Sequence, residues 1–181
     1  RVIAEVINDP AMPIHWGKNQ PGMQAREEHR EPVVFRNDAV HCVVAWLRAR
    51  DVAVDAAQRF ATAGYHKQIV NRLLEPFAHI SVVVTATEWD NFFTLRDHPD
   101  AQPEIQVLAR AMKEAMEDST PALLSHHEWH MPYVTENEKV NLFPSDALKL
   151  SVARCARVSY NNHDGSSPVI EKDFELYEKL I

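Results

Sequence analysis

The spacing of apolar residues along the chain predicts a protein rich in helices. From Asp38 to Gly64, Val, Leu and Ala recur at intervals of three, four and seven, which is typical of one buried helix face. Gly64 is a natural residue to end that helix, because glycine adopts the left-handed conformation found after a helix end. A short helix is predicted over residues 67–75, since it must stop before Pro76. Residues 1–8 are predicted to form a helix that ends at the Asn-Asp-Pro sequence.

The pattern changes in the middle of the chain. Residues 77–85 are apolar and largely β-branched, which predicts a buried strand. Thr87 is predicted to be the N-cap of a helix that runs to Arg96. Pro103 is predicted at the first position of the next helix, over about residues 104–117.

The last third of the chain predicts two more helices. Residues 126–144 are less regular, and Ser145 is predicted to cap a helix over residues 146–159. The sequence NNHDGSSP predicts a turn, and Pro168 is predicted to start a final helix. These helices and the strand favour an α+β fold and one domain over residues 1–181.

Composition narrows the possible functions. The chain has 181 residues, of which 45% are hydrophobic, enough for one ordinary core. Its net charge of -7 argues against a nucleic-acid surface, and it has no apolar run of 18 residues to span a membrane. Two cysteines make no disulfide framework, so a reducing cytoplasm is expected. The chain starts at Arg1 without Met, which suggests an interior piece of a longer protein.

Polar residues interrupt the apolar segment from Asn71 to Gln106 and suggest a binding site. They are Arg72, Asn91, Arg96, Gln102 and Glu104. Arg72 and Arg96 have apolar neighbours, and a buried arginine needs a carboxylate, a phosphate or carbonyl oxygens as partner. A guanidinium matches phosphate and pyrimidine oxygens with two hydrogen bonds. On the pattern alone, capping of helix ends or pairing with Glu75 and Asp97 is the more common role, and Asn91 is more often solvent-facing.

Two other groups of residues are weaker candidates. His126 and His130 of the sequence HHEWH are spaced to share a zinc ion if the segment is helical, but no third ligand is evident. A polar loop with some aromatic packing fits this run better. Cys155 lies between Arg154 and Arg157, whose charges favour a reactive thiolate, but no base accompanies it. Cys42 lies in the apolar stripe of the first long helix and is expected to act as a small hydrophobic residue.

Several motifs together resemble the flavin-dependent thymidylate synthases. The sequences NRLLEP, TATEWDNFFTLR and DAQPEIQ are similar to the second half of that family's pattern. SVARCARVSY, at residues 151–160, resembles the helix that opens those enzymes, here placed after the other motifs. This order resembles the permuted relatives associated with phages. GKNQPGMQA and HHEWHMPY also look like that subgroup.

The resemblance implies a fold, a reaction and roles for individual residues. It implies a helix-rich domain around an antiparallel sheet, in a homotetramer that holds FAD between subunits. The implied reaction is reductive methylation of deoxyuridine monophosphate, with methylenetetrahydrofolate as carbon donor and NADPH as reductant. Arg72 would bind the substrate, and Arg96 would contact the pyrimidine oxygens and stabilise developing charge. Asn91 and Thr85 would contact the flavin. The family needs no protein nucleophile, because the flavin performs the difficult step.

The chain also departs from that pattern. Thr85 and Thr87 replace an Asn and an Arg of the family, and the family's motif R-H-R-x-x-S is absent. The H-x-S-P segment that usually follows the ARVSY helix is absent too, and both gaps fit a fragment with weak or no activity by itself. A catalytically inactive relative that serves as a nucleotide-binding or assembly module is the alternative, and a zinc hydrolase is a more distant one.

Overall fold

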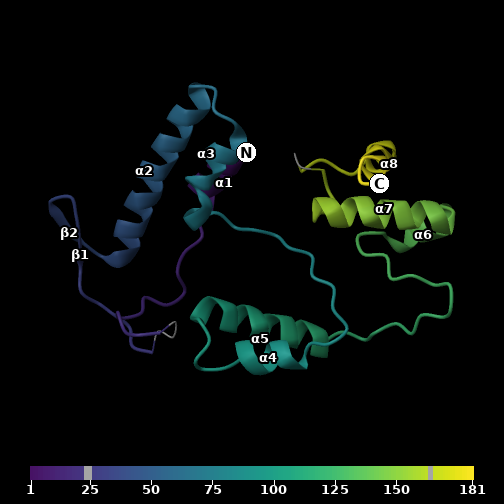
Figure 1. The fold of residues 1–181 in the computed structure, drawn as a ribbon, viewed down its shortest axis with the longest axis horizontal. Coiled ribbons are helices and arrows are strands. Elements are labelled where there is room, and N and C mark those ends of the chain that lie inside the picture. The colour runs from purple at the N-terminus through teal and green to yellow at the C-terminus, as the bar shows by residue number, and fades with distance from the viewer. Residues whose placement is uncertain (23–25, 163–164) are drawn as a thin grey trace. The chain divides into compact units, whose positions relative to one another are not determined.

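The computed structural model describes residues 1–22, 26–162 and 165–181, which form two compact units. The first unit contains residues 1–80 and 86–119, and the second contains residues 81–85 and 120–181. Figure 1 labels the helices and strands of both.

The first unit has its core around one long helix. Helix α2 (Cys42–Thr62) packs against α1 (Val2–Asn8) and α3 (Lys67–Arg72), and the 3-10 helix η1 (Glu75–Phe77) follows. The buried side chains of this core are Val6, Val54, Ala57, Val70, Leu74 and Phe77. The helical spacing in the sequence is therefore confirmed, and Gly64 lies beyond the end of α2 with a φ of +84°. The predicted helix over residues 67–75 is interrupted after Arg72.

Helix α2 begins four residues later than the sequence predicted. Strands β1 (Val33–Phe35) and β2 (Asp38–Val40) pair antiparallel, with Phe35 opposite Asp38. Arg36, in the two-residue turn between them, has a φ of +61°. The prediction that residues 38–41 are helical was wrong, because this short hairpin uses their backbone groups and His41 then caps α2 by accepting from the Val43 amide.

The predicted strand over residues 77–85 does not form. Phe77 belongs to η1, and residues 78–86 have no regular structure and run as a drawn-out coil (Figure 1). Residues 79–88 make no backbone hydrogen bond within the described chain. The segment is also exposed rather than buried, with Ile80 at 84% and Val82 at 64%. β-Branched composition favours extended backbone, but a strand needs a paired neighbour, and the described residues supply none.

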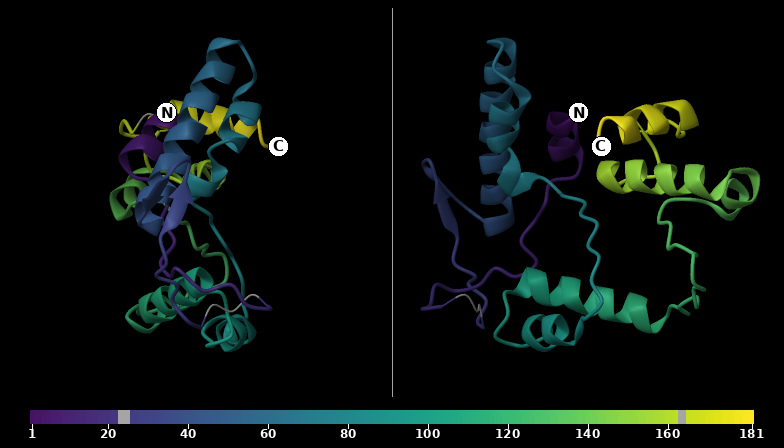
Figure 2. Two further views of the ribbon diagram at one scale, coloured as in Figure 1. Left: turned by 90° about the vertical axis from the view of Figure 1, so that its left-hand side faces the viewer. Right: turned by 45° about the vertical axis from the view of Figure 1, so that its right-hand side comes forward.

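Two helices form the remaining part of the first unit. Helix α4 (Asp90–Arg96) lies alongside α5 (Pro103–Glu117), as the views in Figure 2 also show. The prediction of Pro103 at the first helical position is confirmed. The predicted N-cap at Thr87 was wrong, because α4 starts at Asp90 after Trp89 and has no side-chain cap. Trp89 packs with Phe92 and Phe93, with ring centroids 5.4–6.2 Å apart within this trio.

In its described residues, the second unit contains three helices. Helix α7 (Pro144–Arg157) packs against α8 (Ile170–Glu178) and the short α6 (Glu136–Asn141). Val134, Ala147 and Leu150 are the buried residues of its core. Helix α7 starts at Pro144, one residue before the predicted cap Ser145. Helix α8 starts two residues after Pro168.

The described parts of NNHDGSSP turn as predicted, since the Gly165 amide donates to the Asn162 carbonyl. Residues 163–164 of that turn lie outside the described residues. The chain is thus helix-rich with a small antiparallel sheet, which agrees with α+β. None of the helices in the described part of the chain is long and apolar enough to cross a membrane.

Candidate functional site

The predicted site residues lie at helix ends and on the surface. Arg72 is the last residue of α3, while Asn91 and Arg96 share α4. Thr85 falls in the segment that groups with the second unit. All four residues are exposed, so the prediction that this part of the chain is buried was wrong. Thr85 lies in the irregular segment before α4, α4 has no fully buried residue, and α3 buries Val70 but not Arg72.

Both arginines are free to bind a ligand. Among the described residues, neither Arg72 nor Arg96 has an ion pair or a side-chain hydrogen bond. Asp97, the nearest carboxylate in sequence to Arg96, instead accepts a hydrogen bond of 2.8 Å from Arg110 on α5. Pairing with Glu75 and Asp97 is therefore not what the structure shows, whereas both arginines do stand in the last turn of their helices, the other common role. A solvated guanidinium with no protein partner keeps all five of its donors for an anion.

Asn91 is also available. Its side chain is exposed on α4 and has no partner in the described chain. An amide group offers both a donor and an acceptor, which suits the edge of a heterocycle.

The arginines beside Cys155 have a structural role instead. The buried guanidinium of Arg154 donates to the carboxylates of Asp173, at 2.8 Å, and Glu138, at 2.7 and 3.0 Å. Arg157 donates to the same Asp173 at 2.5 Å. Both positive charges are thus compensated by carboxylates on neighbouring helices. They are therefore not available to stabilise a thiolate at Cys155.

The two carboxylates of this cluster, Glu138 and Asp173, were not predicted from the sequence. Glu138 was recognisable, because Thr135 and Glu138 have the spacing of a capping box, which the structure contains. The Arg154 guanidinium, whose hydrogen bonds dominate, lowers the pKa of Glu138 from 4.5 to about 2. Asp173 carried no such signal, because its partners lie 16 and 19 residues away and meet it only when α7 and α8 pack.

The HHEWH run does not form a helix. Residues 126–127 form a turn, so His126 and His130 do not share a helix face. The Glu128 carboxylate accepts a hydrogen bond of 2.6 Å from the Ser125 amide, which lowers the pKa of Glu128. Over the described ranges, no three His, Cys, Asp or Glu side chains are grouped so that they could hold a metal ion.

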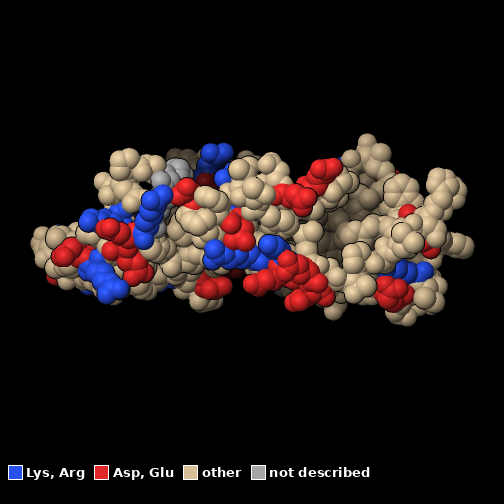
Figure 3. All heavy atoms as spheres, turned by 90° about the horizontal axis from the view of Figure 1, so that it is seen from below, with Lys and Arg blue, Asp and Glu red and all other residues tan. Residues whose placement is uncertain are grey.

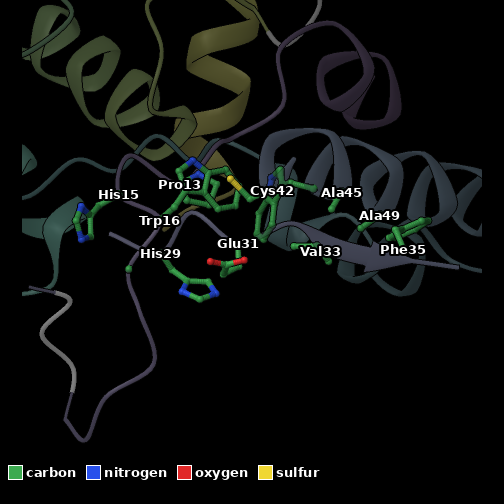
Figure 4. Close-up of a pocket in the computed structure, with 12 residues that line it drawn as sticks. Pro13, His15, Trp16, His29, Glu31, Val33, Phe35, Cys42, Ala45 and Ala49 are labelled. Carbon is green, nitrogen blue, oxygen red and sulfur yellow. The ribbon is translucent and has the colours of Figure 1, made fainter. Parts of the chain in front are cut away.

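A cavity that the sequence did not predict lies in the first unit. Its volume is about 550 Å³, within the usual range for small-molecule sites. The close-up in Figure 4 shows residues of α2 at one side and His29 and Glu31 of the preceding loop at another. The lining residues are Pro13, His15, Trp16, Gly17, His29, Glu31, Val33, Phe35, Cys42, Ala45, Trp46 and Ala49.

Backbone and aromatic contacts hold the walls of this cavity. The Trp46 indole donates to the Ala11 carbonyl at 3.0 Å and packs edge-on against Trp16, with ring centroids 6.1 Å apart. The His29 amide donates to the Trp16 carbonyl at 2.7 Å, which joins the two halves of the loop. No sequence spacing could have revealed this cavity, because it forms where the loop, the hairpin and α2 meet.

Comparison with known proteins identifies the family. The family model described as thymidylate synthase complementing protein matches residues 18–122, which is more than half of the chain. The chain therefore belongs to this family, that of the flavin-dependent thymidylate synthases, as the motifs at residues 71–106 predicted. The match includes Arg72, Asn91 and Arg96 and ends before the motif at residues 151–160. No curated protein sequence and no solved structure matches the chain.

Proposed function

We propose that the protein acts in the reductive methylation of deoxyuridine monophosphate to thymidine monophosphate. Methylenetetrahydrofolate supplies the carbon, and NADPH supplies the hydride through FAD. In the overall reaction, one NADPH and one proton are consumed, and tetrahydrofolate and NADP⁺ are released. Membership of the family supports this general activity, while the individual substrates and cofactors are part of the proposal.

The observation that carries the proposal is the pair of unpartnered arginines within the matched region. A dianionic phosphate and two pyrimidine carbonyl oxygens are the groups that a guanidinium binds best. Arg72 binds the nucleotide in this proposal. Arg96 donates to the pyrimidine oxygens, where negative charge develops as the ring is attacked, and so it lowers the barrier.

The flavin supplies the hydride when it is bound. Asn91 is suited to hold it, because its side-chain amide is exposed and unengaged and can both donate to and accept from a ring edge. Thr85 offers only a hydroxyl at a position where the family has a longer amide. The hydroxyl is shorter than an amide side chain, so Asn91 is expected to matter more for flavin affinity.

The test uses Arg96→Ala and calorimetric titration with deoxyuridine monophosphate. We expect at least a hundredfold loss of affinity, because a charge-assisted pair of hydrogen bonds is removed, about 3 kcal/mol or more. Arg59→Ala is the matched control: it removes an exposed arginine from α2, and we expect no change in nucleotide affinity. An Arg96→Ala protein that binds the nucleotide normally would contradict the role of Arg96.

Flavin content separates an enzyme from an inactive relative. The purified protein is expected to show the absorbance of oxidised FAD, and Asn91→Ala is expected to lower the flavin content. A colourless protein that takes up no added FAD would favour the inactive binding or assembly module instead.

A further inference from the structure

We infer that the cavity between the Trp16 loop and α2 binds a small organic cation, a primary ammonium group that carries one apolar chain. The Trp16 loop consists of residues 9–32, which join α1 to β1. This binding site goes beyond the proposed reaction, because its lining includes none of the residues assigned to the nucleotide or the flavin.

The charge of the lining favours a cation. Among the described residues that line the cavity, none is Lys or Arg, and Glu31 is the acidic one. Glu31 has no hydrogen-bonding or ionic partner within the described chain. A carboxylate only accepts hydrogen bonds, so it suits a ligand that brings N–H donors together with a positive charge.

The basic residues of the Trp16 loop are each paired with a carboxylate other than Glu31. Lys18 lies 3.5 Å from Glu27, Arg26 lies 2.8 Å from Asp100, and Arg30 lies 3.5 Å from Glu28. Glu31 is thus the carboxylate that these side chains leave uncompensated. His29 lies on the same side of the cavity as Glu31 (Figure 4), and a neutral imidazole adds one acceptor for a ligand N–H.

Two tryptophans form a corner of the cavity that also suits a cation. The indole rings of Trp16 and Trp46 are nearly perpendicular, at 81°, and their centroids are 6.1 Å apart. Both side chains are half-buried and line the cavity. The negative face of an aromatic ring attracts an ammonium group within about 6 Å of its centroid, and Trp gives the strongest contact of this kind. An anion gains nothing from such a corner.

Apolar side chains form much of the remaining wall and suit the chain of the ligand. Val33 and Phe35 belong to β1, and Ala45 and Ala49 lie one turn apart on α2. The small alanine side chains leave room for a hydrocarbon chain, which is removed from water when it packs there. The ligand therefore combines a charged nitrogen at Glu31 with an apolar chain against α2.

Hexylammonium is the probe for this site, and titration calorimetry measures its binding. We expect saturable binding, with 1-hexanol bound about tenfold or more weakly, because the alcohol has the same chain without the charge. Hexanoate, which carries the opposite charge, is expected not to bind.

Glu31→Gln is the main variant, because it keeps the size of an exposed side chain and removes its charge. It is expected to weaken hexylammonium binding about tenfold or more and to leave the affinity for 1-hexanol unchanged. Glu27→Gln is the control. It removes the same charge from the same loop at a residue that does not line the cavity, so unchanged binding is expected.

A second pair of variants tests the aromatic corner. Trp16→Leu keeps an apolar side chain but removes the π-face, and it is expected to weaken hexylammonium binding about threefold or more. Trp129→Leu removes an exposed tryptophan of the second unit and is expected to change nothing.

Cys42 shows where the ligand lies, because it lines the cavity. In a Cys155→Ser protein the other cysteine is absent, so the rate of modification by methyl methanethiosulfonate, a neutral thiol reagent, reports on Cys42. Saturating hexylammonium is expected to slow this rate about threefold or more, because a bound ligand restricts access to the thiol. Hexanoate is expected to leave the rate unchanged.

Three results would overturn the inference. These are unchanged hexylammonium affinity in Glu31→Gln, equal affinity for 1-hexanol and hexylammonium, and undiminished modification of Cys42 with hexylammonium present. None of these measurements depends on flavin, nucleotide or turnover, so they succeed or fail independently of the proposed reaction.

Discussion

Glu138 shows how one side chain can connect two parts of a small unit. Its carboxylate accepts two hydrogen bonds from Arg154 and one of 2.9 Å from the Thr135 amide. These bonds favour the charged form, and they hold the pKa of Glu138 at about 2 against burial, which acts in the opposite direction. The same side chain therefore caps α6 and compensates a buried charge on α7.

This pKa predicts a pH dependence of folding. A carboxylate whose pKa is lower in the folded state stabilises the protein above its unfolded pKa of about 4.5, and this contribution is lost as the pH falls towards 2. Its size is about 3 kcal/mol at neutral pH. Urea unfolding of the protein and of Glu138→Gln measures it: the difference in unfolding free energy is expected to shrink between pH 5 and pH 2. A difference that stays constant over this range would contradict the prediction.

At Arg72 and Arg96, the sequence predicted the family but not the surroundings of the two side chains. The arginine motifs placed both residues in the correct family, and both occupy the ends of helices, as expected. Their burial could not be predicted, because it depends on which face of each short helix is covered. The alternative partner Asp97 was also unpredictable, since Arg110 reaches it from the next helix.

Helices α7 and α8 are joined by charge as well as by apolar packing. Arg154 and Asp173 are both fully buried and lie 2.8 Å apart, and Arg157 also donates to Asp173. Removing one member of a buried ion pair leaves its partner uncompensated, which typically costs about 3–5 kcal/mol.

Arg154→Met is therefore expected to lower the free energy of unfolding by about 3–5 kcal/mol. It is also expected to increase amide hydrogen exchange over residues 144–178. Arg59→Met on α2 is the control. Arg59 pairs with Asp55 one turn away on the same helix, and both side chains are exposed, so little change in the free energy of unfolding is expected. Normal stability of Arg154→Met would mean that the apolar contacts of α7 suffice to hold the second unit together.

Elements with local signals were predictable, and those that need distant partners were not. Pro103 at the start of α5 and Gly64 after α2 depend only on backbone preferences of the residues themselves. A strand forms only where its backbone finds a partner. The hairpin at residues 33–40 has one, and the strand predicted at residues 77–85 has none in the described chain. The cavity beside Trp46 depends on three separate segments, so its residues gave no common signal along the sequence.

At the scale of the whole molecule, positively and negatively charged side chains are interspersed on the surface, and many apolar side chains are exposed. On the face drawn in Figure 3, most Lys and Arg lie beside Asp or Glu. The segment from Ile80 to Val84 is β-branched and exposed, and its backbone groups have no partners in the described chain. An exposed segment with unpaired backbone groups and β-branched side chains can pair with a strand of another chain. Val107 and Leu108 on α5 are exposed as well. These exposed apolar residues favour association between copies of the chain.

We therefore expect the protein to self-associate through this segment. Light scattering during gel filtration should give a mass above that of one 20.7 kDa chain, increasing with protein concentration. Val82→Lys with Val84→Lys is expected to shift the mass towards the monomer, because lysine on an unpaired strand opposes pairing between chains. Gln58→Lys together with Thr94→Lys adds the same charge at exposed residues of α2 and α4 and should leave the mass unchanged. A monomer at all concentrations would contradict self-association, and an unchanged oligomer in the Val82 and Val84 double variant would place the interface elsewhere on the chain.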